Sequence, residues 1–297
     1  MSSHQPEFLE HSRIWENLRY IYPVVSRRAG GVSLGINLNI DKVCNFGCIY
    51  CEVNRADIPL YRNVNSAALE SELIAILTLV KSGRFFNDPR FSRLLKENIP
   101  PQVRDIAFSG DGEPTTFRNF PAIVQTVIAT RAALDLQDIP ITLITNASMF
   151  HRSSVLQALK DITAAGGEIW AKLDAGAAAY FQQINRAAIP FSRILQNIVL
   201  AGKIMPLVLQ SCFMQVAGIG PNSQEIAEYI QRIREFVCAG AQISRIQIYT
   251  VARPPADRTV TALNTPELEA ICAQISAALP NILVQRYDGF WSGYTYE

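Results

Sequence analysis

One stretch of sequence decides how this chain folds and what it holds: Asn37-Leu38-Asn39-Ile40-Asp41-Lys42-Val43-Cys44-Asn45-Phe46-Gly47-Cys48-Ile49-Tyr50-Cys51. Three cysteines, Cys44, Cys48 and Cys51, fall within it. Thiolates are preferred ligands of iron–sulfur clusters, and this spacing lets one loop hold three corners of a four-iron cluster. The fourth iron then has no protein ligand, and an open coordination position can bind a small molecule. The stretch therefore predicts a reactive cluster.

Two other uses of clustered cysteines fit the sequence less well. A structural zinc ion usually takes four ligands, and the three histidines, His4, His11 and His151, lie far from the cysteines in sequence. Disulfides are disfavoured because three is an odd number and no export signal is visible. A zinc-stabilised binding module, which would purify colourless, stays open as an alternative.

The pattern C-x3-C-x2-C, with Tyr50 directly before the last cysteine, resembles the radical S-adenosylmethionine superfamily. The resemblance implies a [4Fe-4S] cluster whose open iron binds the amino and carboxylate groups of S-adenosylmethionine. It implies that an electron from the reduced cluster breaks the sulfonium C–S bond and yields a 5'-deoxyadenosyl radical that removes a hydrogen atom from substrate. It places Tyr50 among the cofactor-binding residues and implies a reduced flavodoxin or ferredoxin as electron donor.

Length and composition set the class of protein. Of 297 residues, 49% are hydrophobic, which suffices for one sizeable core. The net charge of +1 shows no overall excess of positive charge of the kind that favours nucleic-acid binding. The N-terminus lacks the plan of a signal peptide, and no apolar run approaches the ~20 residues that span a bilayer. We expect a cytoplasmic protein without a membrane partner, where thiols stay reduced.

Strand-like and helix-like segments alternate along the chain, which predicts an α/β fold with a parallel sheet and right-handed crossovers. Helical periodicity covers residues 66–82, 222–237 and a segment from 265 onward. The resemblance implies an incomplete (β/α)6 TIM-type barrel with outer helices over residues 34–253, a short N-terminal extension (1–33) and a C-terminal helix-strand addition (254–297) packing on the barrel. The candidate strands are 34–40, 103–109, 139–146, 168–174, 207–217 and 244–252.

Several candidate strands carry one polar face. In residues 168–174, for example, Lys172 and Asp174 lie opposite Ile169, Ala171 and Leu173. If the apolar faces meet the helices, the polar faces point into the barrel, which suggests an open cavity rather than a filled one. Solvent exposure of one sheet face would produce the same pattern.

A second motif, Ser109-Gly110-Asp111-Gly112-Glu113-Pro114-Thr115-Thr116, follows the second candidate strand. Glycines let backbone approach a ligand closely, and a carboxylate accepts hydrogen bonds from an ammonium group. The segment resembles the superfamily's Gly-Gly-Glu motif, which binds the methionine amino group. It departs from that pattern at Asp111, which stands where the first glycine is expected. The resemblance implies cofactor binding by Gly110, Asp111, Gly112 and Glu113; a plain turn is the alternative.

Other strand ends supply further candidates. The resemblance adds Asn146, Lys172 and Asp174 to the cofactor-binding residues. Cys212 lies on a candidate strand and is a further candidate, for the role of a catalytic thiol. Cys238 and Cys272 fall in helical patterns, which favours buried core cysteines.

The substrate is the least determined part of the hypothesis. The segments Cys-Asn-Phe-Gly-Cys-Ile-Tyr-Cys and Gly-Glu-Pro-Thr resemble the wyosine-synthase-like branch of the superfamily, which implies chemistry on an RNA base. A peptide or protein substrate is the alternative within the enzyme class. A non-catalytic iron–sulfur electron-transfer protein is the alternative outside it, and such a protein has no need of residues 110–113.

Overall fold

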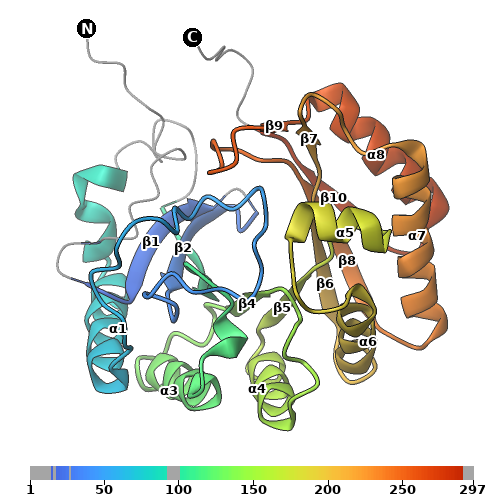
Figure 1. The fold of residues 1–297 in the computed structure, drawn as a ribbon. Helices are drawn as coiled ribbons and strands as arrows, with labels where there is room; N and C mark the ends of the chain where they lie inside the picture. Colours follow the sequence, from blue (N-terminus) through green and yellow to red (C-terminus); the bar gives the residue numbers. More distant parts are fainter. Residues whose placement is uncertain (1–14, 16–17, 27, 92–100, 290–297) are drawn as a thin grey trace, which may run out of the picture. The chain divides into compact units, whose positions relative to one another are not determined.

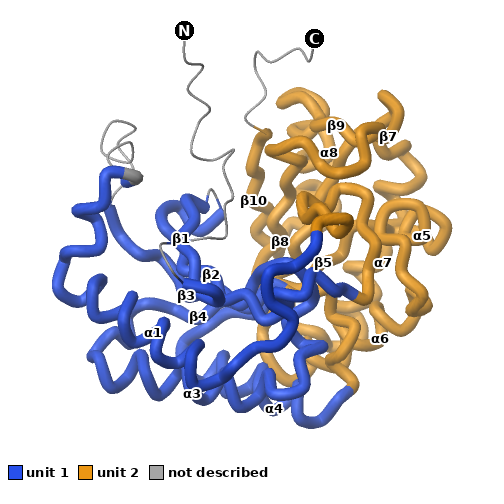
Figure 2. Tube along the Cα trace, turned by 60° about the vertical axis from the view of Figure 1, so that its left-hand side comes forward, with its two compact units in different colours: residues 1–44, 58–144, 152–169 blue, residues 45–57, 145–151, 170–297 orange. Residues whose placement is uncertain are grey.

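The structure of the protein is a computed structural model that describes residue 15 and residues 18–26, 28–91 and 101–289 (Figure 1). Its contacts divide these residues into two compact units, coloured separately in Figure 2. Unit 1 holds the described residues up to 44 together with 58–144 and 152–169, and unit 2 holds 45–57, 145–151 and those from 170 onward. Each unit is described by itself.

Unit 1 is built on four neighbouring strands in the order β1-β2-β3-β4. β1 pairs with β2 antiparallel through a turn at Gly30, whose φ of 73° suits glycine. β2, β3 and β4 are parallel, with Leu34 opposite Ile106 and Ile106 opposite Ile141. The strands are β1 (Ile21–Ser26), β2 (Gly31–Ile36), β3 (Val103–Phe108) and β4 (Ile141–Thr145).

The helices of unit 1 bury one apolar face each, and Figure 1 draws α1, α3 and α4 next to one another along the strands. On α1, Leu69, Leu73, Ile76 and Leu77 are the buried residues, which is the face expected from the sequence. The helices are α1 (Ser66–Lys81), α3 (Phe120–Ala133) and α4 (Ser153–Ala164), with short 3-10 turns η1 (Arg84–Asn87), η2 (Pro89–Phe91) and η3 (Pro114–Thr116).

Unit 2 holds parallel strands in the order β5-β6-β8-β10. Their register aligns one polar row, in which Lys172 pairs with Gln210, Gln210 with Gln247, and Gln247 with Gln285. A separate antiparallel pair joins β7 to β9. The strands are β5 (Glu168–Lys172, whose first two residues belong to unit 1), β6 (Leu207–Cys212), β7 (Met214–Val216), β8 (Ile243–Tyr249), β9 (Val260–Ala262) and β10 (Leu283–Tyr287).

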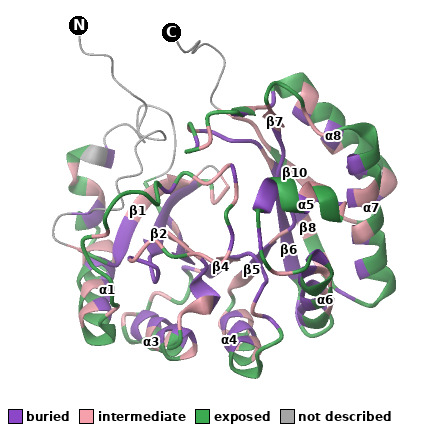
Figure 3. Cartoon of the chain, viewed as in Figure 1, coloured by how far each residue is buried: buried purple, intermediate pink, exposed green. Residues whose placement is uncertain are grey.

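The helices of unit 2 begin where the sequence supplies caps. Asn222 accepts a hydrogen bond from the Glu225 amide at the start of α7, and Asn264 with Glu267 forms a capping box at the start of α8. Figure 3 shows buried residues on one side of these helices and exposed residues on the other. The helices are α5 (Ala178–Asn185), α6 (Phe191–Gly202), α7 (Ser223–Cys238) and α8 (Thr265–Ala278).

The six predicted strands each overlap an observed one, and each observed strand ends one or more residues before its predicted end. Strand 34–40 stops at Ile36, because the Asn37 side chain accepts the Asn39 amide 3.0 Å away and turns the backbone. Strand 207–217 is divided into β6 and β7, because the Phe213 amide bonds to the Tyr249 carbonyl before β7 leaves to pair with β9.

Two features of the fold differ from the sequence-based prediction. The short strands β1, β7 and β9 were not predicted as separate elements. Cys238 is exposed, which contradicts its prediction as a core cysteine, since it is the last residue of α7. Among the described residues, the search for helices long and apolar enough to cross a membrane finds none.

Candidate functional site

The cysteine loop begins at the division between the two units. Cys44 is the last residue of the first segment of unit 1, and Cys48 and Cys51 lie on the 45–57 segment of unit 2. None of the three is in a disulfide, and all three have intermediate exposure. The Cys51 amide bonds to the Cys48 carbonyl at 3.0 Å, which makes a tight turn between these two sulfurs.

Helix α5 holds the backbone on both sides of Cys48. The Gly47 amide donates to the Asn185 carbonyl at 3.0 Å, and the Ile49 amide donates to the Ile184 carbonyl at 2.9 Å. These carbonyls belong to the last turn of α5, where the helix leaves its own acceptors without intrahelical partners. The end of α5 therefore fixes the position of the loop around its middle cysteine.

Side chains next to the cysteines add further anchors. The Phe46 ring packs edge-on against Phe181 of α5 with ring centres 5.6 Å apart. The Asn146 side-chain amide donates to Asn45 at 2.8 Å, and Asn45 donates in turn to the Ser148 hydroxyl at 2.8 Å. Asn146, predicted as a cofactor-binding residue, thus contacts the cysteine loop itself.

Two nitrogen donors point at the sulfurs of unit 2. The Asn185 amide nitrogen lies 3.4 Å from Cys48 Sγ, and an Arg55 guanidinium nitrogen lies 3.5 Å from Cys51 Sγ. Burial, and next the Asp174 carboxylate, raise the pKa of the Cys48 thiol to about 12, while the Asn185 hydrogen bond lowers it. A metal that binds here must therefore displace a proton, as thiolate ligation generally requires.

Asp174 is the centre of a buried network directly behind Cys48. Its carboxylate, in a residue that is 3% exposed, accepts hydrogen bonds from the Tyr50 hydroxyl at 2.6 Å and the Asn185 amide at 3.0 Å. It also accepts the Cys212 backbone amide at 2.9 Å and pairs with Lys172 Nζ at 3.1 Å. The structure therefore brings together Tyr50, Lys172 and Asp174, three of the predicted residues, and pairs two of them with each other.

Lys172 completes this network from the polar row of the sheet. Its ammonium donates to the Tyr249 hydroxyl at 2.6 Å and lies 5.0 Å from the centre of the Tyr50 ring. Burial lowers the pKa of Lys172, but the Asp174 carboxylate and Tyr249 outweigh that effect and raise it. Burial and then Asp174 raise the pKa of Tyr50 well above its ordinary value. At neutral pH the ammonium stays charged and the Tyr50 hydroxyl keeps its proton to donate.

Cys212, the candidate catalytic thiol, is buried at the end of β6. It is 1% exposed and packs with Ile49, Ile184 and Met214 in one apolar cluster. Its backbone contact to Asp174 places it beside the network, and its thiol belongs to the packed interior of unit 2.

In unit 1, the two glycines of the second motif pack against the chain that leads to Cys44. A Cβ added to Gly110 would stand 2.9 Å from Asn37 Cα, closer than side chains allow. A Cβ added to Gly112 would overlap the Val43 carbonyl oxygen and stand 2.8 Å from Asn39 Cβ. Both positions need glycine because backbone meets backbone there.

Asp111 and Glu113 are both held by hydrogen bonds within unit 1. Asn37 donates its side-chain amide to Asp111 at 2.6 Å and accepts the Asp111 backbone amide at 3.1 Å. Glu113, 3% exposed, accepts the Thr115 amide at 3.1 Å and also the Thr115 hydroxyl. These bonds fix the orientation of both carboxylates, as binding of a small cation requires.

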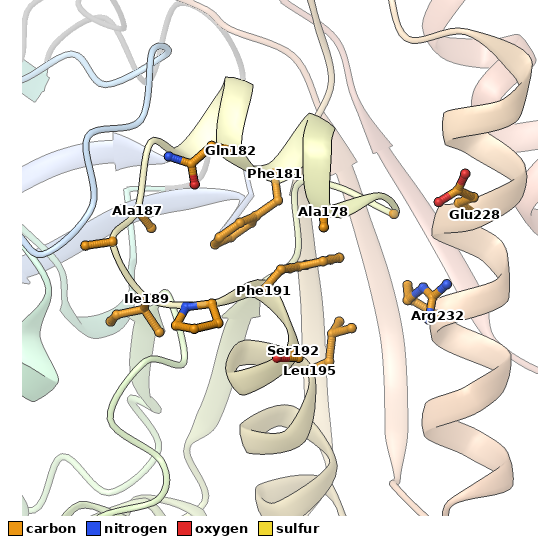
Figure 4. A pocket seen from close by; sticks show the side chains of 13 residues that line it. Ala178, Phe181, Gln182, Ala187, Ile189, Phe191, Ser192, Leu195, Glu228 and Arg232 are labelled. Atoms are coloured by element: carbon orange, nitrogen blue, oxygen red, sulfur yellow. The ribbon is translucent and has the colours of Figure 1, made fainter.

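A separate pocket of about 520 Å³ lies among α5, α6 and α7 in unit 2 (Figure 4). Phe181 and Phe191 stack with ring centres 4.7 Å apart, and Glu228 and Arg232 line it from α7. The lining residues include none of the predicted cofactor-binding residues. Phe181 in the pocket lining also touches Phe46 of the cysteine loop.

Sequence reasoning missed Asn185 and Arg55 as partners of the site. Asn185 ends α5 directly before Arg186, whose φ of 44° is left-handed. The only sequence signal is that asparagine commonly stands at a helix end, which says nothing about what its side chain contacts.

The residues fit the cluster that the cysteine spacing predicts. Three cysteines outside any disulfide share one loop, and N–H groups point at two of the sulfurs, as suits thiolate ligands. Within the part of the chain that the structure describes, no group of three His, Cys, Asp or Glu side chains is arranged around a single metal ion. A four-iron cluster binds each thiolate to a different iron, so its ligands stand farther apart than those of one ion.

Known sequences relate this chain to one superfamily. The sequence profile of the radical SAM superfamily matches residues 38–233, more than half of the chain. A UPF0026 protein of Helicobacter pylori (strain J99) is 25% identical over 80% of this chain and 68% of its own length. UPF0026 protein MJ1312 of Methanocaldococcus jannaschii is 26% identical over 84% of this chain and 67% of its own length. The chain thus spans about two thirds of these relatives, whose names describe no activity.

Two solved structures have a fold similar to that of this chain. A radical SAM methyltransferase from Sphaerobacter thermophilus matches 91% of this chain and 69% of its own with a TM-score of 0.59 at 10% identity. TYW1 with a bound lysine-pyruvate adduct matches 82% of this chain and 73% of its own with a TM-score of 0.50 at 12% identity. At such identities the likeness shows the fold, and it confirms the predicted class, an α/β partial barrel with a mostly parallel sheet and outer helices. With the matched profile spanning both sequence motifs, this chain belongs to the radical SAM superfamily.

Proposed function

We propose that the chain is a radical SAM enzyme in which Cys44, Cys48 and Cys51 hold a [4Fe-4S] cluster that binds S-adenosylmethionine at its open iron. When bound and reduced, the cluster supplies the electron that cleaves S-adenosylmethionine to methionine and the 5'-deoxyadenosyl radical, which removes a hydrogen atom from substrate. Because the chain belongs to the radical SAM superfamily, it is an enzyme. The observation that carries the cluster assignment is the loop of three cysteines outside any disulfide, with N–H donors at two of the sulfurs.

The second motif and the Asp174 network supply the remaining roles. Gly112 lets the backbone of residues 110–113 lie against the chain before Cys44, and Glu113 is oriented to accept the methionine ammonium. Gly110 and Asp111 shape that same segment through their contacts with Asn37. These four residues are proposed as the cofactor's contacts in unit 1.

In unit 2, Tyr50, Asn146, Lys172 and Asp174 are proposed as the cofactor-binding residues. Lys172 carries a charge that suits a carboxylate, and Asp174 holds it in place at 3.1 Å. Asn146 acts through Asn45 on the cysteine loop. We further propose that residues 34–253 form the catalytic domain, with 1–33 and 254–297 as extensions.

An RNA base is the substrate class that we propose. Support comes from the segments Cys44–Cys51 and Gly112–Thr115, which resemble the wyosine-synthase-like branch, and from a fold that resembles TYW1. A reduced flavodoxin or ferredoxin is proposed as the electron donor. If the substrate were a peptide instead, adding RNA would not change turnover.

Spectroscopy of the cluster tests this function. The protein is reconstituted anaerobically with iron and sulfide, reduced, and its electron paramagnetic resonance spectrum is recorded with and without S-adenosylmethionine. We expect four irons per chain and a spectrum that changes when the cofactor is added, with neither in a Cys44→Ala/Cys48→Ala/Cys51→Ala variant. A cluster whose spectrum ignores the cofactor would indicate an electron carrier, and a colourless protein with stoichiometric zinc would indicate a binding module.

A further inference from the structure

We infer that Asn185, at the end of α5, is a positioning residue that holds Cys48 and raises the reduction potential of the cluster through an N–H···S hydrogen bond. The inference rests on the proposed function, because it takes Cys48 as a cluster ligand. Asn185 belongs to neither sequence motif, and it reaches the cysteine loop from 137 residues away in sequence.

The orientation of the Asn185 amide is decided by its neighbours. Its nitrogen lies 3.4 Å from Cys48 Sγ and 3.0 Å from Asp174 Oδ2. A thiolate and a carboxylate only accept hydrogen bonds, so the NH2 end must face both, and each acceptor takes one hydrogen. The opposite amide, with oxygen toward the carboxylate, would place two acceptors against each other. The Asn185 oxygen itself is buried and has no hydrogen-bond partner among the described residues.

Asp174 keeps this amide from rotating. The Tyr50 hydroxyl donates to Oδ2 of the carboxylate, the oxygen that also accepts from Asn185, and the Cys212 amide and the Lys172 ammonium hold Oδ1 on the other side. Asn185 is 2% exposed, so water has little access to replace it. The donor to Cys48 is therefore held by a network whose members are themselves immobilised.

The same residue also fixes where Cys48 stands. The Asn185 carbonyl accepts the Gly47 amide, while its side chain donates to the sulfur of the next residue along the loop. Asn185 thus forms hydrogen bonds to the loop through both its backbone and its side chain. A ligand position set in this way varies little between the oxidised and reduced states.

A hydrogen bond to a ligand sulfur favours the reduced cluster, because reduction adds negative charge that the N–H group stabilises. Hydrogen bonds to the sulfurs are among the factors that set the potential of iron–sulfur clusters. The charge of Asp174 would lower the potential, but Lys172 pairs with it at 3.1 Å. The Asn185 amide therefore adds a contribution that raises the potential of the cluster.

The test compares reduction potentials of reconstituted full-length protein without S-adenosylmethionine, by redox titration followed with electron paramagnetic resonance. Asn185→Leu removes the donor at similar volume, and Asn185→Ala removes it without any risk of a clash. Gln183→Leu is the matched control, since Gln183 is an exposed amide on the same helix. Hydrogen bonds to charged groups are stronger than those between neutral groups, so we expect one-electron reduction to become about tenfold less favourable, a fall of about 59 mV, in both Asn185 variants.

Each outcome decides the inference. A lower potential in the Asn185 variants with a wild-type value in Gln183→Leu supports it, as does loss of cluster uptake by a variant that keeps the wild-type melting temperature. Wild-type potentials in both Asn185 variants, or an equal fall in the Gln183 control, overturn it. Failure of the proposed function looks different, because the wild-type protein would then take up no cluster or would hold one whose spectrum does not change when S-adenosylmethionine is added.

Discussion

Replacing Gly112 by alanine tests how the second motif supports the cysteine loop. The added Cβ would overlap the Val43 carbonyl oxygen and stand 2.8 Å from both Cβ and Cγ of Asn39, where ordinary contact begins at 3.4 Å. The Asn39 side chain must therefore retreat by 3.4 − 2.8 = 0.6 Å, and the Val43 backbone must retreat further. Since Val43 directly precedes Cys44, the first cluster ligand must shift as well.

The cost follows from this overlap. Inserting a methyl group into a packed site costs about 1–3 kcal/mol, and each kcal/mol lowers the melting temperature of a chain of this size by roughly 2–4 °C. We expect Gly112→Ala to melt several degrees below wild type by circular dichroism. We also expect it to bind less iron and sulfide per chain after reconstitution, because the Cys44 backbone is displaced.

Gly220→Ala is the matched control for this prediction. The nearest atom to an added Cβ at Gly220 is Leu263 Cδ2 at 3.4 Å, an ordinary contact. Its unfolding free energy should stay within about 0.5 kcal/mol of wild type. If Gly112→Ala kept wild-type stability and iron content, the close approach between residues 110–113 and the chain before Cys44 would be refuted.

Two further predictions concern charged side chains. Lys172→Met leaves the Asp174 carboxylate buried without its cation and should lower the free energy of unfolding, measured in urea, by about 3–5 kcal/mol. The control is Lys81→Met, which removes an exposed ion pair with Asp135 at 3.0 Å and should lower it by about 0–1 kcal/mol. Equal losses of stability in the two variants would contradict the burial argument. Burial raises the pKa of Glu225 from 4.5 to about 7 in the folded protein. Its protonation therefore adds stability that is complete below pH 4.5 and is lost as pH rises through 7. Melting curves recorded at several pH values should show this loss of stability in wild type, at most about 1.4 kcal/mol per pH unit. The plot of stability against pH should be flatter for Glu225→Gln. Parallel plots for the two proteins would exclude Glu225 as the source.

Local sequence carries the features that were predicted successfully. The three cysteines need only their own spacing to be noticed, and the starts of α7 and α8 need only Asn222 and Asn264 with the glutamate three residues later. The alternation of strands and helices likewise fixes the fold class through local periodicity, and the fold comparison confirms it.

Contacts between residues far apart in the chain could not be predicted from the sequence. Tyr50 meets Asp174 across 124 residues, and Asn185 meets Cys48 across 137. Strand periodicity placed Lys172 and Asp174 on one face, but whether they face a ligand or each other depends on a side-chain rotamer that periodicity does not determine. The end of strand 34–40 was also missed, because it depends on a single hydrogen bond to the Asn37 side chain.

Release of 5'-deoxyadenosine tests the account most directly. The anaerobically reconstituted protein is incubated with S-adenosylmethionine and a strong reductant, with and without transfer RNA, and the nucleoside is quantified by chromatography and mass spectrometry. The account predicts 5'-deoxyadenosine from the wild-type protein and none from the triple Cys44→Ala/Cys48→Ala/Cys51→Ala variant. Equal amounts from both proteins, or none from a wild-type protein that carries a full cluster and is supplied with transfer RNA, would contradict it.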